Sequence, residues 1–227
     1  MPIVAEPVIP SLFLPQLRAL RRVIFDRVLP IFASIDSEAE QVERDSLSAL
    51  LAAADEDADT ADLYEAAHSD GLAHFELMVS IRQGLINALT IQVSHLFEQQ
   101  RYFIARDTIL DVEGDSRKLE SRFRAKLDDR GVDDSMFIHR GKLLELDLVA
   151  NAAKHAEGQS ADKLRALRPE LFTHPSIRDE IPPEEHGQIP ITRPLMGEDL
   201  FVGEEDLRAY IDAVEAYWRF VLHSLAP

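Results

Sequence analysis

Apolar residues recur at intervals of three and four along most of the chain, the spacing that gathers side chains on one face of an α-helix. This pattern predicts long helices over about residues 61–108 and 135–157, and an amphipathic C-terminal helix over about 207–225 with Trp218 on its apolar stripe. The period-two alternation that is typical of half-buried strands is missing over most of the sequence. We therefore predict an all-α helical bundle whose core includes Trp218.

Proline marks the segments that interrupt this pattern. Four prolines stand within the first 15 residues, which predicts an extended N-terminal arm over 1–15 followed by a single α-helical domain over 16–227. Pro30 is expected to end or kink the first helix. Residues 173–202 contain five prolines, so they should form a small insertion before the C-terminal helix, either irregular or a β-hairpin.

Charge and composition restrict the classes of function. The chain has 41 acidic and 24 basic residues and a net charge of −17, which repels nucleic acid at long range and favours a basic protein partner. An RNA or nucleotide ligand would need a local basic groove. Cysteine is absent, which fits a cytoplasmic protein, and the sequence has neither a signal-peptide pattern nor an apolar run of about 18 residues that predicts a membrane span.

Polar residues interrupt the apolar helical run of residues 143–158. Asp147, Asn151 and His155 are four residues apart, so their side chains should follow one another along one helix face, with Lys154 beside them. One interpretation is a buried, hydrogen-bonded structural network. The other is a functional site in which His155 acts as an acid or base and Lys154 supplies positive charge.

The motif Asn-x-x-x-His near the end of an apolar helix, here Asn151 and His155, resembles the HEPN superfamily (higher eukaryotes and prokaryotes nucleotide-binding domain). The resemblance covers mainly residues 75–172. It implies a helical bundle that forms a homodimer, and active members are metal-independent ribonucleases of toxin–antitoxin and phage-defence systems. Carried over to this chain, it implies that His155 is a general base toward a ribose hydroxyl and that Asn151 and Lys154 hold phosphate.

The sequence departs from the HEPN motif at its arginine position, which falls on Ala150. Phosphate stabilisation would then depend on Lys154 or on an arginine of another segment, such as Arg82 or Arg140. The chain is also similar to uncharacterised bacterial helical proteins that have an Asn-x-x-Lys-His-x-x-Gly-x-Ser segment followed by Arg-Pro-x-Leu-Phe. Those segments are residues 151–160 and 168–172 here, and this resemblance brings no known activity.

Motifs of other enzyme classes are missing from the sequence, including a glycine-rich phosphate loop, a His-Glu-x-x-His helix and a nucleophile elbow. We therefore expect neither a cofactor nor a metal ion. Two functions stay open: a HEPN-like component of a bacterial defence or toxin–antitoxin module that cleaves RNA or processes nucleotides, and a non-catalytic helical binding or scaffold protein with a structural Asn/His network.

Overall fold

The computed structural model describes residues 8–55, 58–107, 121, 123–125 and 127–225, and within these ranges the fold is an all-α bundle without strands. Its α-helices are α2 (Leu14–Val23), α3 (Ile35–Ala53), α4 (Thr60–Asp107), α6 (Arg140–His155), α7 (Gln159–Leu167) and α8 (Glu204–Leu225). The predicted fold class is confirmed. The predicted helix over 61–108 corresponds to α4, except that residue 108 lies outside the described residues.

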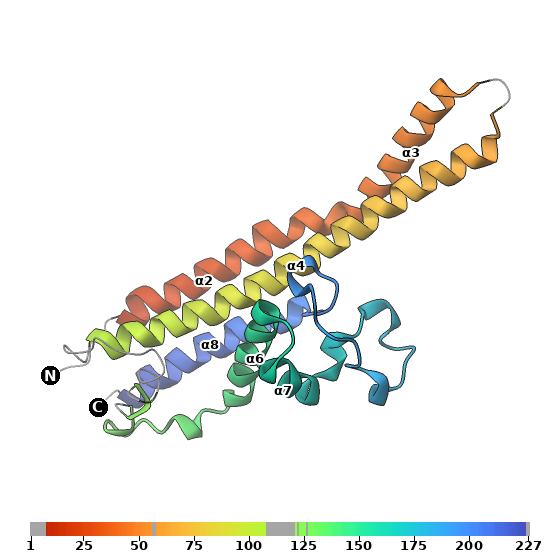
Figure 1. The fold of residues 1–227 in the computed structure, drawn as a ribbon. Coiled ribbons are helices and arrows are strands. Elements are labelled where there is room, and N and C mark those ends of the chain that lie inside the picture. Colours follow the sequence, from red (N-terminus) through yellow and green to blue (C-terminus); the bar gives the residue numbers. More distant parts are fainter. Residues whose placement is uncertain (1–7, 56–57, 108–120, 122, 126, 226–227) are drawn as a thin grey trace.

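The first part of the chain forms one long rod that runs antiparallel to α4 (Figure 1). A π-helix, η1 (Ile9–Phe13), leads into α2, and a second π-helix, η2 (Ile24–Val28), and a 3-10 helix, η3 (Leu29–Ser34), connect α2 to α3. The helical geometry changes just before Pro30, where a change was predicted.

The prediction of an extended arm over residues 1–15 is wrong for residues 8–15, which are helical. Pro10 and Pro15 each occupy one of the first two positions of a helical segment. At Pro10 proline is tolerated because its missing N–H would have no intrahelical partner and its fixed φ already suits a helix. Pro15 stands at the junction where the π-helix η1 passes into α2. Residues 1–7 of the predicted arm lie outside the described residues.

The hydrophobic core lies where α6, α8 and the rod pack on the C-terminal half of α4. Trp218 is fully buried there, and its ring centroid is 4.9 Å from that of Phe13 and 5.8 Å from that of Phe97. Its indole N–H donates a hydrogen bond of 2.6 Å to Oε1 of the buried Gln100. The prediction that Trp218 belongs to the core is confirmed.

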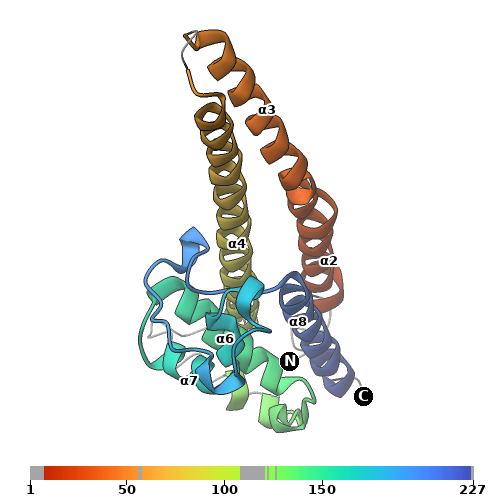
Figure 2. The same ribbon diagram turned by 90° about the vertical axis from the view of Figure 1, so that its right-hand side faces the viewer.

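Beyond this body, α3 and the N-terminal half of α4 project as a two-helix arm, residues 35–80 (Figures 1 and 2). Small residues lie where the two helices meet. Ala39 and Ala67 are buried, and a Cβ placed on Gly71 would lie 2.9 Å from Cβ of Glu43. Helix axes can approach closely only where such side chains meet. Gly71 thus permits the contact that holds the arm together.

The insertion between α7 and α8 is irregular, and the β-hairpin alternative is wrong. Residues 168–203, all of which are described, contain no strand. They form short 3-10 helices instead: η5 (Pro169–Phe172), η6 (Pro175–Ile177), η7 (Pro183–Glu185) and η8 (Pro194–Met196). Each of these begins at a proline, which removes one backbone donor from any potential strand ladder.

Candidate functional site

Lys154 and His155 lie at the C-terminal end of α6 and are exposed to solvent. Together with the insertion they line a pocket of about 310 Å³, formed by residues 153–156 of α6 and 192–196 of the insertion. Arg193 is among these residues. The pocket thus brings together three basic side chains from two segments of a strongly acidic chain.

The end of α6 at this pocket has an unusual backbone. Ala156 has φ 61° and ψ −135°, and its N–H still donates a hydrogen bond of 2.9 Å to the carbonyl of Ala152. A non-glycine residue in such a conformation costs about 1–3 kcal/mol and persists only where the surroundings enforce it. The turn follows His155 directly, so it determines how this side chain is presented at the rim of the pocket.

The insertion side of the pocket is held by direct backbone contact with α4. A Cβ placed on Gly84 would lie 2.2 Å from the carbonyl oxygen of Leu195, and one placed on Gly197 would lie 2.1 Å from the carbonyl oxygen of Ser80. Glycine is required at both positions because any side chain would separate η8 from α4. The glycine in the middle of α4 is therefore a packing site for the insertion.

A buried amide adds polar anchors to this contact. Asn87 on α4 is fully buried, and its Nδ2 donates hydrogen bonds of 2.6 Å to the carbonyl of Pro194 and 2.8 Å to that of Leu200. These carbonyls lie on either side of the turn that contains Gly197. Asn87 therefore bridges the two ends of the turn and holds η8 against α4.

Asp199 organises the backbone that carries Arg193. One of its carboxylate oxygens accepts hydrogen bonds from the N–H of Thr192 at 2.8 Å, the Thr192 hydroxyl at 2.8 Å and the N–H of Arg193 at 2.6 Å. Burial alone would raise the pKa of Asp199, but these hydrogen bonds outweigh it and lower that pKa below its ordinary value. The guanidinium of Arg193 itself forms an ion pair with Glu198.

The predicted polar line is only partly formed. Asn151 donates a hydrogen bond of 3.2 Å to the carboxylate of Asp147, but the pocket lining does not include Asn151. Both Asp147 and His155 are exposed, so the buried-network interpretation is wrong for these two residues. The structure brings Lys154 and His155 into one pocket and leaves Asn151 behind them on α6.

The arginines that the sequence suggested lie elsewhere. Arg82 forms an ion pair with Glu204, and Arg140 begins α6, about 22 Å along the helix axis from His155. Ala150, the position of the HEPN arginine, is 6% exposed and faces the core. Arg193 was missed because it is distant in sequence, and only the folding of the insertion back over α4 brings it to α6.

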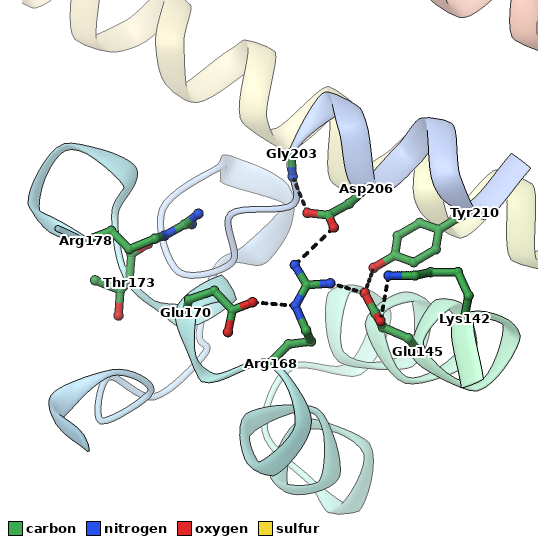
Figure 3. Close-up of polar contacts among 9 residues, drawn as sticks. All are labelled: Lys142, Glu145, Arg168, Glu170, Thr173, Arg178, Gly203, Asp206 and Tyr210. Carbon is green, nitrogen blue, oxygen red and sulfur yellow. Dashed lines mark hydrogen bonds and ion pairs between the residues drawn. The ribbon is translucent and has the colours of Figure 1, made fainter. Parts of the chain in front are cut away.

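A second polar cluster, centred on Arg168, joins α6, the insertion and α8 (Figure 3). The guanidinium binds the carboxylates of Glu145, Glu170 and Asp206, and its contact with Asp206 is 3.0 Å long. Glu145 is 6% exposed. Besides Arg168, the carboxylate of Glu145 accepts hydrogen bonds from the hydroxyl of Tyr210 at 2.9 Å and from Nζ of Lys142 at 2.8 Å.

The surroundings of the Arg168 cluster favour a charged guanidinium and a protonated tyrosine. Burial alone would lower the pKa of Arg168, but the three carboxylates raise it, so the guanidinium stays charged. Burial, together with the charge of Glu145, raises the pKa of Tyr210 and keeps its hydroxyl protonated as a donor. The Arg-Pro-x-Leu-Phe segment supplies this hub and two buried apolar residues, Leu171 and Phe172.

The described residues contain no group of three His, Asp or Glu side chains placed to hold a metal ion. None of the helices within the described ranges combines the length and apolar character that a membrane crossing requires. Neither the sequence nor the structure matches a family model, a curated protein or a solved structure.

Proposed function

We propose that this protein is a HEPN-like component of a bacterial defence or toxin–antitoxin module that binds RNA or a nucleotide through phosphate in the pocket of Lys154, His155 and Arg193. One observation carries the proposal: these three basic side chains line the same pocket of about 310 Å³ on a chain with a net charge of −17. A local concentration of positive charge on an acidic surface is what an anionic ligand needs.

Arg193 supplies the group that the motif lacks at Ala150. Its planar guanidinium can bind two phosphate oxygens at once, which a lysine cannot do. In the free protein this guanidinium is paired with Glu198, and its side chain is 64% exposed. A phosphate would therefore compete with the half-buried carboxylate of Glu198 for Arg193, and we expect Glu198 to limit the affinity of the pocket.

His155 is the proposed general base. On an RNA substrate it would remove the proton of a ribose 2′-hydroxyl, and the 2′-oxygen would attack the adjacent phosphorus. The bond from phosphorus to the 5′-oxygen would break, the leaving oxygen would take a proton from solvent, and a 2′,3′-cyclic phosphate would remain. Lys154 and Arg193 would stabilise the charge that develops on the phosphate oxygens.

The proposal includes a homodimer in which a second copy covers the face around the pocket. Leu195 and Met196 line the pocket and are 50% and 60% exposed. Leu77 and Ile81, one helical turn apart on α4 and close to the crossing of η8, are exposed as well. Exposed apolar side chains grouped beside a polar site are typical of surfaces that a partner covers.

The test measures RNA binding and cleavage separately. We expect Lys154→Ala and Arg193→Ala each to weaken binding of a labelled single-stranded RNA by roughly tenfold, as for a lost charge-assisted hydrogen bond. The matched control Lys163→Ala removes an exposed lysine of α7 and should change binding less than about twofold. Glu198→Gln releases Arg193 and should tighten binding.

The catalytic part of the proposal requires that wild type produce 2′,3′-cyclic phosphate ends and that His155→Ala lose this activity without losing RNA affinity. If the wild type binds RNA through the pocket but leaves it intact, the protein is a phosphate-binding module without catalysis. If RNA binding is absent, or if Lys163→Ala weakens it as much as Arg193→Ala does, the pocket is not the site.

A non-catalytic binding or scaffold protein is the second candidate function. The projecting arm favours this function (Figure 2). The arm adds surface to the molecule but contributes no residue to the pocket of Lys154, His155 and Arg193. This function needs no cleavage chemistry.

A further inference from the structure

A second and larger hollow, of about 560 Å³, lies where the arm leaves the body. One wall is formed by η2, η3 and the start of α3, and the other by α4, with Glu204 of α8 at the body end. Most of the lining side chains are apolar and only partly buried, among them Phe25, Phe32, Phe75 and Val79. We refer to this hollow as the arm groove.

The apolar lining continues along one face of α4. Phe75 and Val79 are four residues apart, and Leu72 precedes Phe75 by three, so the three side chains share a helix face. Leu72 is 50% exposed. The face of Leu77 and Ile81 beside the pocket is a different one, so the arm groove is independent of the proposed phosphate site.

The arm that borders the groove carries most of the negative charge of the protein. Residues 35–80 contain thirteen acidic residues and one arginine, a net charge of −12, whereas the whole chain has −17. Asp36 lines the groove, and Glu40 and Glu43 follow it at intervals of four and three on α3. This spacing continues the acidic rim of the groove along the arm.

The basic residues at the body end of the groove already have partners. Arg82 is paired with Glu204, and the guanidinium of Arg208 lies 3.9 Å from the ring centroid of Phe25. The acidic rim therefore lies toward the arm, while the cations at the body end already contact groups of the protein itself. A ligand that fits must be apolar on one side and positively charged along the part that faces α3.

We propose that the arm groove binds a basic amphipathic helix of a partner protein. The apolar face of that helix packs on Phe75 and Val79, as in other helix-in-groove complexes, and its lysines or arginines face Asp36 and Glu40. Charge complementarity selects this occupant over a second copy of the chain, because the same acidic arm on another copy would be repelled.

The test uses a defined probe, a fluorescein-labelled amphipathic peptide of leucine and lysine of roughly 18 residues, about five helical turns. A peptide of the same composition in an order that is not amphipathic is the probe control. Binding to the full chain is measured by fluorescence anisotropy at about 50 mM and about 500 mM NaCl. We expect the amphipathic peptide to bind more tightly than its permuted form at both salt concentrations.

Two variants with equal charge change locate the site. Asp36→Lys with Glu40→Lys alters the acidic rim, whereas Glu184→Lys with Glu185→Lys alters the insertion, and all four residues are exposed. We expect the first pair to weaken binding by roughly tenfold and the second by less than about twofold. Val79→Asp should also weaken binding, with circular dichroism showing that each variant keeps its helical content.

Equal losses with both pairs would mean non-specific attraction to an acidic protein and would overturn the proposal. So would equal binding of the two peptides, or no binding to wild type. A dimer that is lost with Val79→Asp but kept with Leu77→Asp would identify a second copy as the occupant and would also overturn it. His155→Ala should leave peptide binding unchanged, which keeps this test separate from that of the phosphate pocket.

Discussion

Replacing Arg168 with methionine should destabilise the fold by about 3 kcal/mol. Removing one partner of a buried ion pair typically costs about 3–5 kcal/mol, because the other charge stays buried without compensation. The stranded group here is Glu145, whose side chain is 8% exposed. The lower end of the range applies because Lys142 and Tyr210 still bind Glu145, and because Glu170 and Asp206 keep side-chain exposures of 31% and 20%.

A double-mutant cycle isolates the contribution of the pair. Glu145→Gln removes the charge that Arg168 compensates, so Arg168→Met should cost about 1–2 kcal/mol less in that background than in wild type. Arg219→Met is the matched control, since Arg219 is a 55% exposed arginine of α8 that pairs with Glu215. Its loss should cost no more than about 0.5 kcal/mol.

The measurement is denaturant unfolding followed by tryptophan fluorescence. Trp218 is the one tryptophan of the chain and is fully buried, so its emission reports on the core. If Arg168→Met costs less than about 1 kcal/mol, or if its cost is the same with and without Glu145→Gln, the Arg168 cluster does not hold the three segments together. Circular dichroism of the folded variant serves as a control, because a loss of helical content would reveal a local rearrangement.

Two further predictions concern the core and the pocket. Trp218→Ala should cost about 3–5 kcal/mol by circular dichroism, because it empties a packed site and strands Gln100; an unchanged midpoint would contradict the assigned core. Because the pKa of Asp199 is lowered from 3.8, its hydrogen bonds contribute stability that is present above that pH and lost as pH falls through the lower folded-state value. The Arg193 N–H should lose exchange protection in that acidic window, and Asp199→Asn should remove this pH dependence.

Helix positions could be predicted from the sequence because apolar periodicity is a local property. The pattern for the long helix gave α4 nearly to the residue, and the C-terminal stripe identified Trp218 as core. The N-terminal prolines were misread as an extended arm, since a proline in the first turn of a helix looks the same in sequence as one in an extended segment. A helical proline can be told from an extended one only by the helical structure of the residues around it.

The site was predicted less completely because it depends on contacts between distant segments. Lys154 and His155 could be selected from one helix, but Arg193 reaches them only through Gly84 and Gly197, whose close approach no local pattern reveals. Glu145 did carry a signal. It stands three residues before Leu148 and seven before Ala152, both buried, so helical spacing places a carboxylate on the core face, where it needs a cation.

The length of α4 has a consequence for how the protein opens. Its 48 residues extend over about 72 Å, and its two halves have different surroundings: the C-terminal half lies in the core, while the arm half packs mainly on α3. Backbone amides of one continuous helix should therefore exchange with solvent at very different rates. Residues near Tyr64 should open through local fraying, whereas those near Val93 should exchange only when the whole body unfolds.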